Sequence, residues 1–131
     1  RGAIGRASGL KMLYAALTKG TAALHASTLM AAKSLGLFDD LIHELEQSQS
    51  GTVTAMGRVN SISARAFRWI GEMEEIASTF EDAGVTPNIH AGAAETFQKI
   101  SDSSIGRERV GTVDQDRTLE DTVAAMLVKL D

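Results

Sequence analysis

Residues 8–34 read SGLKMLYAALTKGTAALHASTLMAAKS, and leucine and alanine are the commonest residues in this stretch. Proline is absent and β-branched residues are few, so the stretch predicts one long helix. Ser8 is a suitable N-cap for it, and Gly36 is a suitable C-terminal stop. Gly20 inside it costs ~1 kcal/mol against alanine, which indicates a bend or a place where another backbone packs closely. Its apolar bulk is expected from five leucines: Leu10, Leu13, Leu17, Leu24 and Leu29.

Helix-forming residues also dominate the rest of the chain, whose only proline is Pro87. Alanine, leucine, methionine and glutamate are frequent and β-branched runs are scarce, a composition that favours an all-helical fold. We therefore expect one all-α domain, a helical bundle that takes up residues 1–131. The elements expected after the first helix are helices over 38–47, 52–59, 64–82, 86–100 and from 118 onward, a loop over 47–51, a turn over 60–63, and a surface loop or linker over 101–117.

The last helix is expected to open at Thr118, whose hydroxyl can cap it, with Asp121 three residues later in the position of a capping box. Its apolar face can fold back onto the bundle or dock on a partner subunit. Gly84 is expected to end the helix over 64–82. The apolar face of the last helix consists of Val123, Met126, Leu127 and Leu130.

Bulk composition narrows the class of protein. The formal net charge is -4 and the pI about 5.3, which argues against a face that binds nucleic acid. There is no cysteine, so disulfides and thiolate metal sites are excluded, and a reducing, cytoplasmic location fits. No apolar run reaches the roughly 18 residues of a membrane span. The histidines His25, His43 and His90 have no ligand spacing, so we expect no metal site.

Lys11 is the first charged residue inside the predicted long helix, and Leu10, Met12 and Leu13 surround it. An amine that is partly desolvated loses its proton more readily, and a lysine in that state can act as a base. Alternatively, Lys11 lies near the start of the helix and extends its ammonium into water. Spacing alone leaves both interpretations open.

The residues around Lys11 match a known pattern. Gly2-x-x-Gly5-x-Ala7-x-x-x-Lys11 resembles the motif Gly-x-x-Gly-x-Gly-x-x-x-Lys-x-x-x-Asn, which opens the C-terminal domain of the 3-hydroxyisobutyrate dehydrogenase and 6-phosphogluconate dehydrogenase superfamily. Segments 11–20 and 68–77 are similar to a poorly characterised branch of that superfamily, described as phosphogluconate-dehydrogenase-like with an N-terminal NAD-binding domain. The resemblance covers about residues 2–100.

This resemblance implies the all-α C-terminal substrate and dimerisation domain of an NAD(P)-dependent oxidoreductase that acts on a small hydroxy acid or sugar acid. It implies that Lys11 is the catalytic base in oxidation and the acid in reduction. NAD or NADP would be bound mainly by an N-terminal dinucleotide-binding domain, since no strand followed by Gly-x-Gly-x-x-Gly occurs in this chain. The resemblance also implies a homodimer. Because the chain starts at Arg1 in mid-motif, we expect it to be a piece of a longer protein.

The sequence departs from the family's pattern close to Lys11. The asparagine four residues after the lysine is Ala15 here, so one hydrogen bond to the substrate is lost. The hydroxyl of Tyr14 can replace that donor, or it simply reaches water. The acid that 6-phosphogluconate dehydrogenases carry seven residues after the lysine is Thr18, so decarboxylation of 6-phosphogluconate is not expected. Lys19 can attract a carboxylate or phosphate of the substrate, or it is a solvated or helix-packing lysine.

Trp69 has two arginines nearby in sequence, Arg65 and Arg68. This group is either an anion-binding surface or a core or interface tryptophan flanked by solvated arginines. For the whole chain, the competing class is a non-enzymatic helical interaction module, in which apolar helix faces form an oligomer interface and Lys11 is incidental. A strand and a Gly-x-Gly-x-x-Gly turn encoded upstream would favour the enzyme.

Overall fold

A computed structural model describes residues 5–131, and all regular secondary structure in this part of the chain is helical. The predicted all-α fold is therefore confirmed. Among these residues no helix is both long and apolar enough to cross a bilayer. The elements in chain order are α1 (Arg6–Ser34), α2 (Phe38–Ser48), α3 (Ser50–Met56), the 3-10 helix η1 (Gly57–Ala64), α4 (Ala66–Asp82), α5 (Asn88–Ser101) and α6 (Leu119–Met126).

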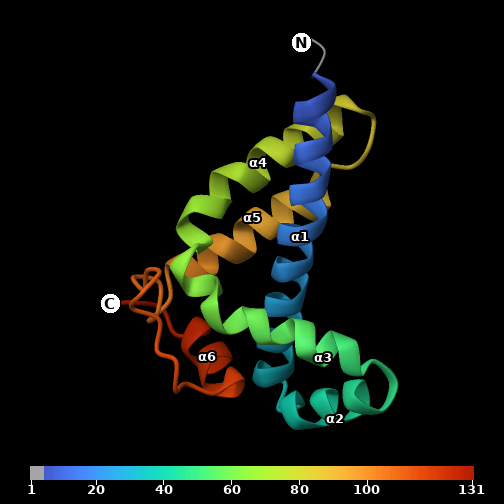
Figure 1. Cartoon of the computed structure of the whole chain (residues 1–131). Helices are drawn as coiled ribbons and strands as arrows, with labels where there is room; N and C mark the ends of the chain where they lie inside the picture. Colours follow the sequence, from blue (N-terminus) through green and yellow to red (C-terminus); the bar gives the residue numbers. More distant parts are fainter. Residues whose placement is uncertain (1–4) are drawn as a thin grey trace.

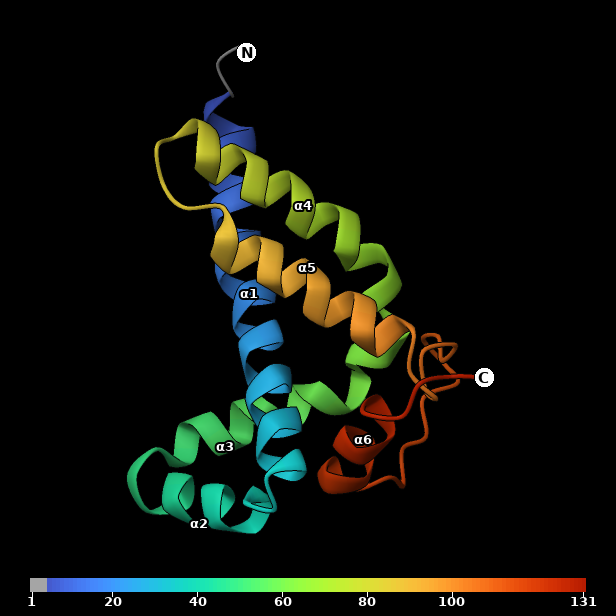
Figure 2. The same ribbon diagram turned by 180° about the vertical axis from the view of Figure 1, so that it is seen from behind.

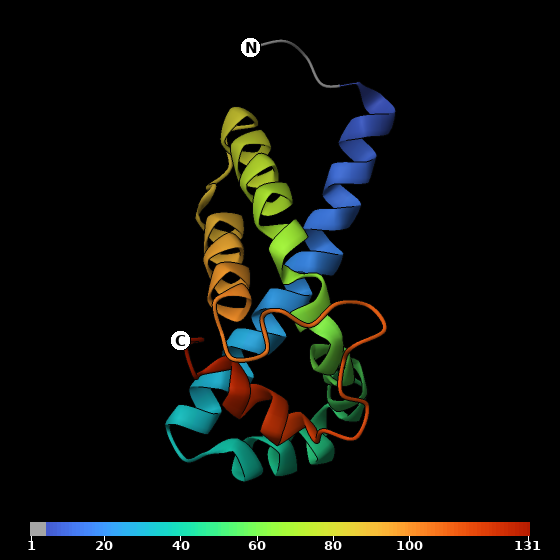
Figure 3. The same ribbon diagram turned by 90° about the vertical axis from the view of Figure 1, so that its left-hand side faces the viewer.

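The long helix α1 forms the axis of the molecule (Figure 1). The pair α4 and α5 lies beside its first half, whereas α2, α3 and α6 gather around its C-terminal end, as the view from behind also shows (Figure 2). The first turns of α1 diverge from α4 and α5 (Figure 3). This end of the helix consequently buries little of its own surface: Leu10 is 60% and Leu13 is 55% exposed.

The hydrophobic core lies where the second half of α1 meets η1, α4, α5 and α6. Close packing along α1 uses small residues, because Ala16, Ala23 and Ala26 are buried there. Alanine lets neighbouring helices approach closely, and most of the large core side chains come from the other elements. The largest fully buried apolar side chains are Phe97, Leu29, Met73, Ile100, Met126, Val59 and Val123.

The leucines that were expected to supply the apolar bulk of α1 are mostly exposed. Only Leu29 among the five is buried, whereas Leu17 is 72% and Leu24 is 63% exposed. Apolar periodicity identifies which positions are apolar, but it does not say whether this chain or another one covers them. The alanine side of α1 faces the rest of the bundle, which leaves the leucine side without cover from the described residues.

Helix α1 starts earlier than predicted, because Gly5 rather than Ser8 occupies the N-cap position. The amide of Gly9 donates to the Gly5 carbonyl at 2.8 Å, so Ser8 already lies within the first turn. At the other end, Gly36 adopts a φ of 72°, the left-handed conformation in which glycine ends helices, as predicted.

Three further helix ends also match the prediction. Gly84, with a φ of 82°, follows the end of α4, and Pro87 comes directly before α5. The Thr118 hydroxyl caps α6 by accepting a hydrogen bond from the amide of Asp121 at 3.1 Å. These signals act locally, which is why sequence reasoning found them.

The predicted loop over 47–51 is wrong, because Gln49 alone separates α2 from α3. Its amide donates to the Leu45 carbonyl at 2.6 Å and its carbonyl accepts from the Thr52 amide at 2.9 Å, so one residue serves both helix ends. Helix α3 then passes directly into η1, which replaces the predicted turn over 60–63 and buries Val59 and Ile62.

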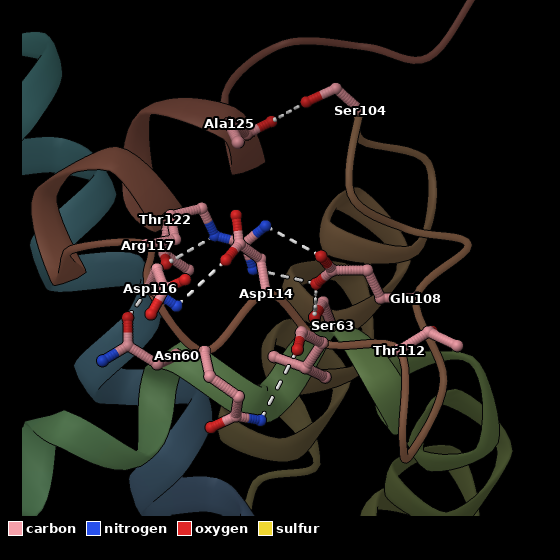
Figure 4. Close-up of polar contacts among 12 residues, drawn as sticks. Asn60, Ser63, Ser104, Glu108, Thr112, Asp114, Asp116, Arg117, Thr122 and Ala125 are labelled. Atoms are coloured by element: carbon pink, nitrogen blue, oxygen red, sulfur yellow. Dashed lines mark hydrogen bonds and ion pairs between the residues drawn. The ribbon is translucent and has the colours of Figure 1, made fainter.

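The segment 101–117 forms no helix beyond its first residue, as predicted, but it is fixed to the bundle. Glu108 forms a two-pronged ion pair with Arg117, whose Nη1 and Nη2 each donate to one carboxylate oxygen at 2.8 Å (Figure 4). Ser63 of η1 donates to the same carboxylate, and Arg117 Nε donates to Thr122 of α6 at 2.9 Å. The hydrogen bond from Arg117 lowers the pKa of Glu108 despite its partial burial. This network ties η1 to α6, so the segment is part of the folded domain.

Candidate functional site

Lys11 lies in the second turn of α1, and its side chain is exposed. No carboxylate pairs with it in the described part of the chain. The flanking Leu10 and Leu13 are exposed as well, so among the described residues the ammonium extends into water, the second of the two interpretations. A further domain or subunit packed over this turn would withdraw it from water. Of the glycine motif, Gly5 precedes the first turn of α1, whereas Gly2 lies outside the described residues.

Tyr14 lies one turn further along α1 and is 72% exposed. Its backbone carbonyl accepts a hydrogen bond from the Thr18 hydroxyl at 3.1 Å. Its own hydroxyl makes no hydrogen bond with the described residues, so it remains available as a donor to another molecule.

Lys19 differs from Lys11 because it packs against α4. Its ammonium donates to the carboxylate of Glu72 and lies 5.4 Å from the centre of the Trp69 ring. Its side chain is 24% exposed. Lys19 is therefore a helix-packing lysine, and the residues beside it give it a second role as part of a cavity.

That cavity, the basic pocket, has a volume of about 280 Å³ between α1, η1 and the start of α4. Three cationic side chains meet there from three parts of the chain: Lys19 from α1, Arg58 from η1, and Arg65 from the junction between η1 and α4. No carboxylate is among the lining residues. The lining residues are Thr18, Lys19, Ala22, Arg58, Ser61, Ile62, Arg65 and Trp69.

The basic pocket contains only part of the anion-binding group suggested by the sequence. Arg65 and Trp69 line it, but Arg68 does not. Trp69 is half-buried and packs edge-to-face on the buried Phe97, with ring centres 5.2 Å apart, so it packs against the core and also forms a wall of the pocket. Sequence reasoning missed Arg58.

A signal for Arg58 was present in the sequence. Arg58, Ser61 and Arg65 follow a helical spacing of three and seven residues, which marks one polar face. That face was overlooked because a turn was expected between them.

A second cavity, the apolar groove, lies on the other flank of α1, against α5 and the end of α4. Its volume is about 640 Å³, and most of its lining is apolar. Residues 18 and 22 of the basic pocket lie on the opposite side of the helix from residues 13, 17, 20 and 24 of the groove. The largest apolar residues of the groove are Leu13, Leu17, Leu24, Phe80 and Ile89.

His90 closes the bottom of the apolar groove. It is buried, its ring lies 4.5 Å from that of Phe80, and its Nε2 lies 3.3 Å from the Ala16 carbonyl oxygen. Because a carbonyl only accepts, Nε2 carries the proton of this hydrogen bond. A Cβ on Gly20 would lie 3.3 Å from the same nitrogen, so a larger residue here would require the His90 ring to shift by a few tenths of an ångström.

The other histidines lie apart from this groove. Burial, and secondly the charge of Arg58, lower the pKa of His25 below its usual value of 6.5. Within residues 5–131 no three histidine, cysteine or acidic side chains are grouped as they would be around a metal ion.

The fold and these two cavities define a small all-α domain with an apolar groove and a basic pocket on opposite flanks of its longest helix. A family model described as Domain of unknown function (DUF1932) matches residues 32–100, which is more than half of the chain. The chain belongs to this family. No curated protein and no solved structure matches it.

The matched region contributes only part of each cavity. It includes Arg58, Arg65 and Trp69 of the basic pocket and His90 of the apolar groove. All but the last turn of α1, with Lys11 and Lys19, lies before it.

Proposed function

We propose that this chain is the C-terminal helical domain of an NAD(P)-dependent oxidoreductase in the 6-phosphogluconate and 3-hydroxyisobutyrate dehydrogenase superfamily. Its substrate is a small hydroxy acid or sugar acid, and Lys11 is the general base or acid. The glycine and lysine motif and the similarity of segment 68–77 support the family. The observation that carries the function is the position of Lys11, exposed and unpaired on the same face of α1 as Thr18, which lines the basic pocket.

Oxidation of a secondary alcohol removes a hydride from carbon and a proton from the hydroxyl. A bound nicotinamide supplies the chemistry of hydride transfer. The described residues contain no strand and no glycine-rich turn for the diphosphate of such a cofactor, so the proposal assigns its main binding site to another domain. The step assigned to this chain is proton transfer. Neutral Lys11 accepts the proton of the hydroxyl, and its ammonium returns the proton in the reverse direction.

The exposed turn around Lys11 is suited to being covered. A domain that packs on Leu10 and Leu13 would bury apolar surface and exclude water from the amine, which favours its neutral form. Tyr14 then donates a hydrogen bond to the substrate in place of the missing asparagine. Lys19 lies two turns from Lys11, about 12 Å along the helix, and attracts an acidic group at the far end of the substrate.

The test uses the protein together with the residues encoded upstream of it. A panel of hydroxy acids, sugar acids and their phosphates is screened for reduction of NAD and NADP. Lys11→Ala should remove most turnover and leave the helical content unchanged. Lys99→Ala, which removes an exposed lysine from α5, should retain it. Near-full turnover in Lys11→Ala would exclude this role of the lysine.

The apolar groove favours a second function, a helical module that dimerises without catalysis. Leu17, Leu24 and Ile89 line the groove and are 72%, 63% and 67% exposed, an apolar surface that a second copy of this chain can cover. Dimerisation is also compatible with the enzyme. An upstream region without a strand and Gly-x-Gly-x-x-Gly turn would favour the module alone.

A further inference from the structure

The basic pocket concentrates positive charge in a chain that is acidic overall. The formal net charge of the protein is -4, yet Lys19, Arg58 and Arg65 meet in one cavity without a carboxylate in its lining. The ammonium of Lys19 is balanced by Glu72. No carboxylate pairs with Arg58 or Arg65 in the described part of the chain, which leaves two positive charges unbalanced.

The hydrogen-bonding groups of this pocket suit a fully ionised ligand. The hydroxyl of Thr18 donates to the Tyr14 carbonyl, and that of Ser61 donates to the Arg58 carbonyl at 3.2 Å, so both protons are already used. The donors that remain belong to the cationic side chains and to the indole N–H of Trp69. Each guanidinium presents a rigid fork of N–H groups that matches the oxygens of an oxyanion. A ligand that only accepts hydrogen bonds is therefore preferred.

The elements that carry these cations are held by the core. Val59 and Ile62, on the same 3-10 helix as Arg58, are 1% and 3% exposed. Trp69 adds an apolar wall beside the charges, and it is braced from behind by Phe97. The volume of about 280 Å³ lies just below the roughly 300–1,000 Å³ of small-molecule sites, so the occupant has few atoms beyond the anionic group.

From this geometry we infer that the basic pocket binds a phosphate group through Arg58, Arg65 and Lys19, with Trp69 as an apolar wall. The group is either the phosphate of a small monoester or inorganic phosphate. A phosphate monoester carries about -1.5 to -2 charges near neutrality, which balances the two uncompensated cations. A single carboxylate would leave one of them unbalanced.

Phosphate recognition by this pocket rests on the proposed function only for the identity of the molecule that carries the phosphate. Binding itself requires neither Lys11 nor a nucleotide. The proposed function and the phosphate site can therefore be tested separately. Lys11→Ala should leave the affinity for phosphate unchanged even where it abolishes turnover.

Trp69 makes the test direct, because it is the only tryptophan of the chain and it lines the pocket. Its fluorescence is followed while inorganic phosphate, glycerol 3-phosphate or glycerol is added at constant ionic strength. We expect both phosphates to change the emission in a saturable way and glycerol to have no effect. Tighter binding of glycerol 3-phosphate identifies a monoester site, and tighter binding of inorganic phosphate identifies a site for the free ion.

Arg58→Gln and Arg65→Gln should each weaken phosphate binding about ten- to hundredfold, the usual loss for a charge-assisted hydrogen bond. Arg68→Gln is the matched control, because Arg68 is an exposed arginine of α4 that does not line the pocket. The affinity of this variant for phosphate should equal that of the wild type. Circular dichroism checks that each variant is folded. No response to either phosphate, or an equal loss of affinity in all three variants, would overturn the inference.

Discussion

The two flanks of α1 carry cavities of different chemistry. On one side Leu13, Leu17 and Leu24 border an apolar groove, and on the other Lys19 borders a pocket with Arg58. Association through the groove would derive from apolar area removed from water, which is nearly independent of salt. Binding in the pocket would derive from charge, which salt screens. The comparison shows that one helix can border an apolar cavity and a cationic cavity on opposite flanks.

The largest effect is expected when the groove is given a charge. Leu17→Asp should weaken self-association at least ~100-fold, since a buried leucine contributes about 1.5–3 kcal/mol and a two-fold interface loses it twice. Sedimentation equilibrium measures the dissociation constant. Val110→Asp alters an equally exposed residue outside the groove and should leave the association as it is. A monomeric wild-type protein would remove the groove's proposed role as a dimer interface.

A smaller effect is expected from two matched glycines. At Gly71, in α4, an added Cβ meets nothing within 4 Å, so Gly71→Ala should stabilise the fold by about 1 kcal/mol. At Gly20 the same Cβ presses on His90, which is buried and hydrogen bonded. Gly20→Ala should therefore be less stable than Gly71→Ala by ~1 kcal/mol or more. Chemical denaturation measures both, and equal stabilisation would mean that His90 moves freely.

The smallest effect concerns His25 and the pocket side of the helix. The pKa of His25 in the folded state is below the usual 6.5, so in the interval between these two values the unfolded chain binds more protons than the folded chain. The free energy of unfolding should therefore fall as the pH drops below 6.5. His25→Gln should reduce this loss, as thermal unfolding across the interval would show. A wild-type protein that gains stability on acidification through 6.5 would contradict the assigned shift.

The same histidine can report on the pocket. Phosphate bound at Arg58 offsets the charge that helps to lower the pKa of His25, so the pKa should rise when phosphate is added. The histidine ring resonances in an NMR titration measure this directly. Leu17→Asp, on the other flank, should leave the phosphate-induced rise intact, and its loss in that variant would mean that the two flanks are coupled.

Most of the helices could be predicted because their signals are local. Gly36, Gly84 and Thr118 end or begin helices through conformations and hydrogen bonds that depend on a few neighbouring residues. The length of the break at Gln49 was overestimated because the polar residues around it are typical of a loop. One residue is enough to separate the two helices. Predictions of helix boundaries fail in this way where polar composition and helix propensity disagree.

The cavities were harder to predict than the helices. Lys11 was singled out from a motif, and Tyr14 and Lys19 from their positions near it on the same helix. The partners of Lys19 come from residues about forty to fifty positions away, which only the packed fold brings together. The exposure of Leu13 and Leu17 could not be predicted either, because apolar spacing is the same whether the covering surface is in this chain or another.

The most direct test of the account is a comparison of steady-state kinetics in the protein that includes its upstream residues. Wild type, Lys11→Ala and Arg58→Gln are measured with one hydroxy acid phosphate that the wild type oxidises. The account predicts that Lys11→Ala lowers kcat about 10²- to 10⁴-fold, as loss of a general base does. Arg58→Gln should instead raise KM and largely retain kcat, because it removes binding shared by the ground and transition states. Wild-type turnover in Lys11→Ala would contradict the central claim.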